Sequence, residues 1–316
     1  MTFPVFSRFL FFLGLWAENA ADSDTRKIPV GGQAVIEGVL MKGPDRWALA
    51  VRRPDGQIFQ ESWGNSSKTK RYPWKLPVLR GIVTMVEMVG TGFRALGKSA
   101  EIALGDSEEE LTKKDLLLAI LIGIAAVVGL FIALPLWLSE AAAGFFSLSA
   151  GARNAVEGVI RGGIFVAYVA IIGLWNDIQQ VFRYHGAEHK TINAFEDVGS
   201  AALTPQVIAL YSRIHTRCGT SFLLIAILIG IVVFSAIGGR GILWRVGLRV
   251  ALLPLVIGIS YEIIRLASKS GFIGKFLMAP MLSLQYLTTR EPDLGQIEIA
   301  LTSLLASLGA PLKREN

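Results

Sequence analysis

All three histidines of this 316-residue chain and its single cysteine fall within residues 185–218. Imidazole nitrogens and a thiolate are the ligands that zinc and other transition metals prefer in proteins. His185 and His189 are four residues apart, so on a helix they lie one above the other on the same face. Two imidazoles at this spacing are close enough to hold one metal ion, and the segment therefore predicts a metal site.

Glu188 lies between the two histidines and completes the pattern His-x-x-Glu-His, the inverted zinc-hydrolase pattern. In such a site two neutral imidazoles hold Zn²⁺, and the glutamate takes a proton from the bound water. The pattern predicts Glu188 as a catalytic general base and a divalent transition metal, zinc first, as cofactor. Gly186, inside the pattern, is unfavourable in a helix interior.

A third protein ligand is needed, and the sequence offers several candidates. Glu196 returns to the same helix face as His185, so we expect it first and His215 next, with Cys218 and Glu262 as further candidates. If His215 and Cys218 both join the two helical histidines, the site is closed and structural. With three protein ligands, one position stays open for water.

Other interpretations of these polar residues remain open. The histidines alternatively form a pH-titrating or hydrogen-bonded cluster at the membrane interface, without a metal. Glu262 lies in an apolar segment, where an ionisable group marks a functional site by default, and its alternative is an ion pair with Arg265. Glu37, in a glycine-rich strand segment, is a further site candidate that would approach from a small sheet.

The elements that position these residues are mostly apolar. The chain is 52% hydrophobic and 18% charged, which excludes a disordered or acidic-tail protein. A helix needs about 20 apolar residues to cross a bilayer. Four segments are therefore predicted to span, near 116–138 with a bend at Pro135, 158–176 with Arg161 reaching to the interface, 218–239 and 242–266.

The distribution of basic residues predicts the orientation. Lysine and arginine are concentrated before the first span, in the central loop 177–217 and after the last span, whereas the loop after the first span carries only Arg153. The positive-inside rule then places both termini and the histidine-containing loop in the cytosol, in a cytoplasmic (inner) membrane. Arg240, Arg245 and Arg249 lie on the opposite side and go against the rule.

The net charge of +6 is typical of cytosolic loops held by anionic lipid, so no specific nucleic acid is expected. The single cysteine excludes an intramolecular disulfide framework. The N-terminal residues lack a good signal cleavage site, so an uncleaved interfacial segment or an over-long gene start is expected. The chain is expected to begin with an extension at 1–28, disordered or interfacial, followed by a small β-rich cytosolic subdomain at 29–78. An amphipathic helix at 79–110 then lies in the membrane interface or, alternatively, packs on the sheet. A membrane domain at 111–270 and C-terminal amphipathic helices at 271–316 complete the chain.

Four blocks resemble the YqhQ-like family of bacterial multi-pass membrane proteins over about Lys27 to Gln296. The blocks are Gly31–Val39, Pro77–Gly81, Arg183–Ala194 and His215–Phe222. Members are described as predicted metal-dependent enzymes without an established substrate. The resemblance implies a multi-pass membrane fold, and metal-type residues at His185, Glu188, His189, His215 and Cys218.

We therefore expect a mainly α, multi-pass helical membrane protein with a small N-terminal β-rich subdomain. The first functional prediction is a membrane-bound, zinc-type hydrolase at the cytosolic interface. The alternative is a non-enzymatic scaffold or biogenesis factor with a structural metal site and a membrane-protein partner besides the lipid bilayer. A metal-ion transporter ranks last, because the two uninterrupted apolar spans contain no charged residue.

Overall fold

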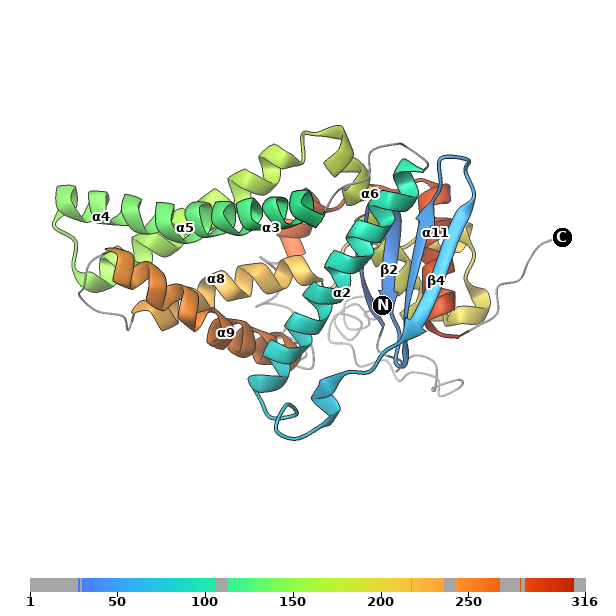
Figure 1. Ribbon diagram of the computed structural model, residues 1–316, viewed down its shortest axis with the longest axis horizontal. Helices are drawn as coiled ribbons and strands as arrows, with labels where there is room; N and C mark the ends of the chain where they lie inside the picture. Colours follow the sequence, from blue (N-terminus) through green and yellow to red (C-terminus); the bar gives the residue numbers. More distant parts are fainter. Residues whose placement is uncertain are drawn as a thin grey trace, which may run out of the picture.

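The computed structural model describes residues 28, 30–105, 113–216, 218–235, 242–267, 279 and 282–309. The expectations for the N-terminal extension, and for the helix over 272–287 except its last residues, lie outside this part of the chain. Long helices form one end of the molecule, and a four-stranded sheet with its covering helices forms the other (Figure 1).

The sheet is an antiparallel meander in the order β1-β2-β3-β4. Its strands are β1 (Gly31–Val35), β2 (Gly38–Lys42), β3 (Arg46–Arg52) and β4 (Ile58–Gly64). Gly56, at the end of the sequence Pro54-Asp55-Gly56 between β3 and β4, has φ +84°, which glycine adopts without a steric penalty. The small β-rich subdomain is thus present.

The central strands are buried on both faces. Val39 and Met41 of β2 point into a core shared with α6 (Asn176–Val198) and α11 (Leu294–Ser307). Leu40, between them, points the other way, into a second core shared with α2 (Leu79–Leu104). Alternation of side chains along a strand sends neighbours to opposite faces. The sheet therefore forms one body with helices that lie far away in the sequence.

Helix α11 fills the core of this body. It begins with a capping box, in which Asp293 and Gln296 each bond the other's backbone N–H. Ile297, Ile299 and Leu304 are each 1% exposed or less, and they pack between the sheet and α6. The helix is buried more deeply than the expected amphipathic surface helix, because both of its long sides are covered.

Helix α2 joins the sheet to the membrane bundle. Its N-terminal part packs on α9 (Ile242–Ala267), where Gly81 lies against Tyr261. Its later part packs on the sheet, where Gly92 lies against the side chain of Gln33. The predicted helix is present, and the alternative in which it packs on the sheet describes its second half.

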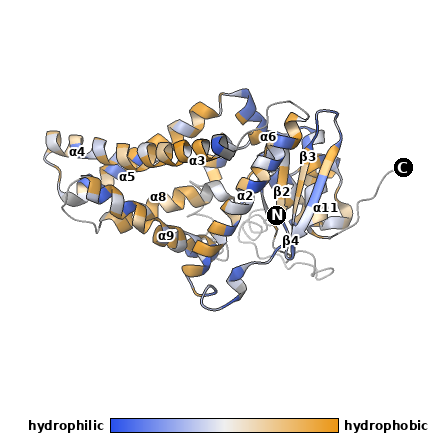
Figure 2. Cartoon of the chain, viewed as in Figure 1, coloured by the Kyte–Doolittle hydropathy of each residue, from blue (hydrophilic) through white to orange (hydrophobic). Residues whose placement is uncertain are grey.

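Among the described residues, three helices are long and apolar enough to cross a membrane: Leu121–Phe146, Gly151–Ile172 and Leu243–Ala267 (Figure 2). They are formed by α3 (Lys113–Val128), the π-helical turn η3 (Gly129–Ala133), α4 (Leu134–Phe146), α5 (Ala150–Ile172) and α9. The first runs further than predicted and the second starts earlier, so the loop between them is short. The predicted span at 218–239 corresponds to α8 (Gly219–Ser235), and residues 236–239 of that prediction lie outside the described part of the chain. Shorter elements are η2 (Lys68–Lys70), η4 (Ser200–Ala202) and α7 (Pro205–Ala209).

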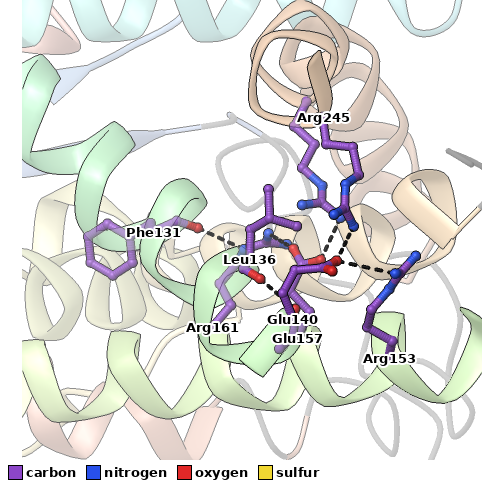
Figure 3. A network of polar contacts seen from close by, with 9 residues as sticks. Phe131, Leu136, Glu140, Arg153, Glu157, Arg161 and Arg245 are labelled. Atoms are coloured by element: carbon purple, nitrogen blue, oxygen red, sulfur yellow. Dashed lines mark hydrogen bonds and ion pairs between the residues drawn. The ribbon is translucent and has the colours of Figure 1, made fainter. Parts of the chain in front are cut away.

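The predicted irregularity at Pro135 takes the form of the π-helical turn η3. Proline has no N–H, so the carbonyl of Phe131, four residues earlier, loses its usual helical donor. The Nε–H of Arg161 on α5 donates to this carbonyl at 2.8 Å (Figure 3). Arg161 is therefore only 6% exposed. The expectation that it reaches out to the interface is wrong, because its donors are used inside the bundle.

Candidate metal centre

Helix α6 presents His185 and His189 one turn apart, as their spacing predicts, with ring centroids 4.4 Å from each other. The Nδ1–H of His185 donates to the carbonyl of Thr288 at 2.8 Å, and the Nδ1–H of His189 donates to the carbonyl of Arg213 at 2.6 Å. A carbonyl only accepts hydrogen bonds, so both neutral rings carry their proton on Nδ1. Each Nε2 atom then carries a lone pair, the form in which histidine binds a metal.

Cys218 completes a group of three ligand atoms. Its Sγ lies 3.2 Å from Nε2 of His185, and the ligand atoms of His185, His189 and Cys218 all lie within 4.8 Å of one another. Tetrahedral zinc holds nitrogen at about 2.0 Å and sulfur at about 2.3 Å, which puts such ligands about 3.5 Å apart. The spacing therefore fits one metal ion. We call these three residues the His-Cys cluster.

The segment before Cys218 is held in place by amides on two helices. The side-chain amide of Asn193 on α6 donates to the carbonyls of Ser212 and Ile214, at 2.7 and 3.0 Å. Gln285, on the helix at 282–288, accepts from the backbone N–H of His215 at 2.8 Å and donates to its carbonyl at 2.7 Å. Two helices that are distant in the sequence thus hold the segment that leads to the cysteine.

Gly186 permits the close approach that gives His185 its Nδ1 partner. A Cβ atom at this position would lie 2.1 Å from the carbonyl oxygen of Arg290. The backbone N–H of Arg290 also donates to the carbonyl of Phe182 on α6, at 2.8 Å. Gly186 is unfavourable for the helix by propensity, but the segment at Arg290 crosses α6 so closely that only glycine fits at this position.

Glu188 is buried beside the cluster. Its side chain lies near Gly32 of β1, where a Cβ atom would come within 3.1 Å of the carboxyl carbon. Burial raises the pKa of Glu188 to about 8, the imidazole of His185 opposes this shift, and the thiolate of Cys218 adds to it. Its Oε2 has no hydrogen-bond partner among the described residues. The carboxyl group predicted as a general base thus has an oxygen available next to the three ligand atoms.

His215 lies at the edge of the cluster, and Glu196 lies behind it. The rings of His189 and His215 are 5.7 Å apart, and His215 is not one of the three mutually close ligands. Burial lowers the pKa of His215 to about 4 and also lowers the pKa of His189, which keeps both rings neutral. Glu196 has an oxygen 3.7 Å from Nε2 of His215. The structure therefore brings Cys218, rather than Glu196, together with the two helical histidines.

The remaining two candidates lie outside the cluster. Glu37, in the turn after β1, reaches α6 but accepts a hydrogen bond from the hydroxyl of Tyr184 at 3.0 Å. Glu262 accepts from Nε of Arg80 on α2 at 2.7 Å and forms an ion pair with it. Glu262 therefore forms an ion pair, as expected, but its partner is Arg80 of α2 and not the expected Arg265.

Sequence reasoning missed the buried Lys190. Its side chain is 5% exposed, donates to the carbonyl of Ala209 at 2.9 Å and pairs with Glu291. A signal was present, since Lys190 follows His189 in a helix stretch that is otherwise apolar or site-forming. A cavity of about 370 Å³ lies elsewhere, between the β2–β3 turn and the ends of α6 and α11, and no residue of the His-Cys cluster lines it.

Comparison with known proteins identifies relatives over most of the chain. The model of a family described as "Protein of unknown function (DUF1385)" matches residues 76–310. The "Uncharacterized protein YqhQ" of Bacillus subtilis (strain 168) is 36% identical over 295 residues, which cover 88% of this chain and 92% of that protein. No solved structure matches. The match to YqhQ agrees with the resemblance seen in the four sequence blocks.

Proposed function

This chain belongs to the DUF1385 family, and because the family description names no activity, we propose a function from the site itself: a membrane-bound, metal-dependent hydrolase of the zinc type. One observation carries the proposal. Three ligand atoms of suitable chemistry, from His185, His189 and Cys218, converge within 4.8 Å of one another beside a buried carboxyl group. Perturbed ionisable groups gathered in this way are typical of functional sites.

The residues of the chain divide the work as follows. His185 and His189 bind through Nε2, while the carbonyls that accept from their Nδ1–H groups fix the ring orientations. A zinc ion held by His185, His189 and Cys218 would supply Lewis acidity and would lower the pKa of a water molecule for attack on a substrate. Glu188 would act as the general base in its ionised form, which a cation bound beside it would favour by lowering the raised pKa of the carboxyl group, and its unpartnered Oε2 would receive the proton.

The second candidate function is a non-enzymatic scaffold or biogenesis factor with a structural metal site. The buried His215 favours it, because this ring lies 5.7 Å from His189 and its Nε2 makes no hydrogen bond among the described residues. A modest shift would bring His215 in as a fourth ligand. The site would then be closed, with no position for water.

The location follows from the charge pattern and supports either function. We place the protein in the cytoplasmic membrane with both termini and the His-Cys cluster on the cytosolic side, since the lysine- and arginine-rich parts of the sequence lie there. The bilayer is the first partner, and a membrane protein is the second. No specific nucleic acid is involved, because the excess positive charge lies next to the membrane.

The first experiment measures metal content by mass spectrometry on the full-length protein purified in detergent without chelator. We expect about one zinc or similar ion per chain, lost in the double variant His185→Ala/His189→Ala and in Cys218→Ser. Glu196→Gln is the matched control and keeps its metal, because Glu196 lies outside the cluster. A wild-type protein that holds no metal after repletion contradicts both candidate functions.

X-ray absorption then separates the two candidates. Two nitrogens, one sulfur and one oxygen around the metal support the hydrolase, whereas three nitrogens and one sulfur support the structural site. Glu188→Gln should keep the metal and lose turnover of a panel of ester, amide and phosphoester reporter substrates. Full turnover in Glu188→Gln would show that the base is assigned wrongly.

A further inference from the structure

The membrane bundle contains a cluster of charged side chains in its half far from the sheet (Figures 1 and 3). We call it the distal cluster; it consists of Glu140 on α4, Arg153, Glu157 and Arg161 on α5, and Arg245 and Arg249 on α9. At 1.5 Å per residue, Glu157 and Arg249 lie about 9 Å inside their apolar helices. Ionisable groups at such depth are costly and are usually functional.

Each carboxylate of the distal cluster is shared between two arginines. Glu157 bonds Arg161 through Oε1 and Arg249 through Oε2. Glu140 pairs with Arg245, and its Oε1 lies 3.2 Å from Arg153 (Figure 3). Four guanidinium groups and two carboxylates leave two positive charges without a counterion among the residues that the structure describes. The residues at 236–241, between α8 and α9, add no acid to this balance.

The most deeply buried member also has free donors. Arg249 is 1% exposed, and neither its Nε–H nor its Nη1 group has an acceptor among the described residues. The guanidinium carbons of Arg249 and Arg161 each lie 5.5 Å from the ring centroid of Phe234, and an aromatic ring is no substitute for the oxygen acceptors that guanidinium N–H groups bind. A buried guanidinium with unused donors is unfavourable unless an acceptor occupies the space beside it.

We propose that the distal cluster binds a phosphate-bearing anion, held by Arg245 and Arg249 through the donors that Glu140 and Glu157 leave unused. A phosphate group fits because its oxygens accept several N–H groups at once and it carries up to two negative charges. A network built only for stability would be neutral and have its donors satisfied. The side chain of Glu140 is 32% exposed, compared with 9% for Arg245, so an anion could reach the distal cluster from the side of Glu140.

Both inorganic phosphate and a lipid phosphate headgroup offer this chemistry. The test uses full-length protein purified in detergent, with radiolabelled inorganic phosphate in one arm. The second arm uses nanodiscs that contain phosphatidic acid in phosphatidylcholine, compared with phosphatidylcholine alone. We expect saturable binding in at least one arm, weakened about tenfold or more in Arg249→Gln, since a hydrogen-bonded charge is lost. Arg265→Gln, an exposed arginine at the other end of α9, is the matched control and binds like wild type.

The outcomes separate the alternatives. Binding in the phosphate arm alone identifies a soluble ion, and binding in the phosphatidic acid arm alone identifies a headgroup. Wild-type protein that binds in neither arm overturns the proposal, and so does a well-folded Arg249→Gln that binds like wild type. If Arg249→Gln elutes as an aggregate, Arg245→Gln takes its place, because the Nε of Arg245 is also without an acceptor among the described residues. The metal content is measured in every variant and stays unchanged.

Discussion

Replacing Gly186 by alanine sets helix propensity against tertiary packing. In an isolated helix the change stabilises by about 1 kcal/mol, because alanine is the better helix former. Here the new Cβ would lie 2.1 Å from the carbonyl oxygen of Arg290, whereas ordinary contacts begin near 3.4 Å. The helix and the crossing chain must therefore separate by about 1 Å. Overpacking of this kind costs about 1 to 3 kcal/mol, so we expect a net loss of stability.

The same displacement reaches the metal centre. Thr288, whose carbonyl accepts from Nδ1 of His185 at 2.8 Å, lies two residues before Arg290. Moving it by about 1 Å breaks this hydrogen bond, and the loss of such a supporting partner lowers metal affinity about 10- to 100-fold. Gly186→Ala should thus lower both the thermal midpoint of the detergent-solubilised protein and its affinity for zinc.

Gly97→Ala is the matched control for this experiment. Gly97 lies within α2, and a Cβ atom there would meet nothing within 4 Å. The control should gain up to about 1 kcal/mol from helix propensity and keep its zinc affinity. A Gly186→Ala protein with an unchanged or raised midpoint and wild-type zinc affinity would refute the argument from close approach.

Two further predictions concern contacts that join distant parts of the chain. Glu262→Gln should lower the thermal midpoint, because it removes the ion pair between Glu262 of α9 and Arg80 of α2. A double-mutant cycle with Arg80→Gln should give a coupling free energy of about 1 kcal/mol. A coupling of zero would mean that the ion pair does not hold the two helices together. Tyr184→Phe should cost about 1 kcal/mol through loss of the hydrogen bond to Glu37, while metal content stays at the wild-type value; loss of metal would place Tyr184 in the centre itself.

Local patterns predicted much of the architecture. The spacing of His185 and His189 placed both on one helix face, and residues 29–78 were expected to form a small β-rich subdomain, which contains the four strands. Glu196 was ranked first as the third ligand because only positions on the same helix could be compared. Cys218 arrives from a segment held by Gln285 and Asn193, and contacts of this range leave no periodic signal.

The distal cluster likewise depends on contacts between distant parts of the chain, which local sequence patterns do not reveal. Arg245 and Arg249 were expected near one end of the predicted span 242–266, on the side opposite the cytosol, with no partner assigned. In the structure both lie within α9 and meet Glu140 and Glu157, about 90 to 105 residues earlier in the chain. Burial of a charge depends on its partner, and the partner is invisible until the helices are packed.

The position of α11 has a consequence for how the protein is made. The sheet is complete at residue 64, but the helix that fills its core begins only at residue 294. Translation at about 5 to 20 residues per second leaves roughly 10 to 50 s between the two. Throughout this time the nascent sheet presents Val39 and Met41 without α11, and before α6 is made also without α6, while the membrane helices are being inserted. Early release of the ribosome-bound chain would therefore yield a sheet prone to aggregation, and a chaperone that shields this face would act before the last helix emerges.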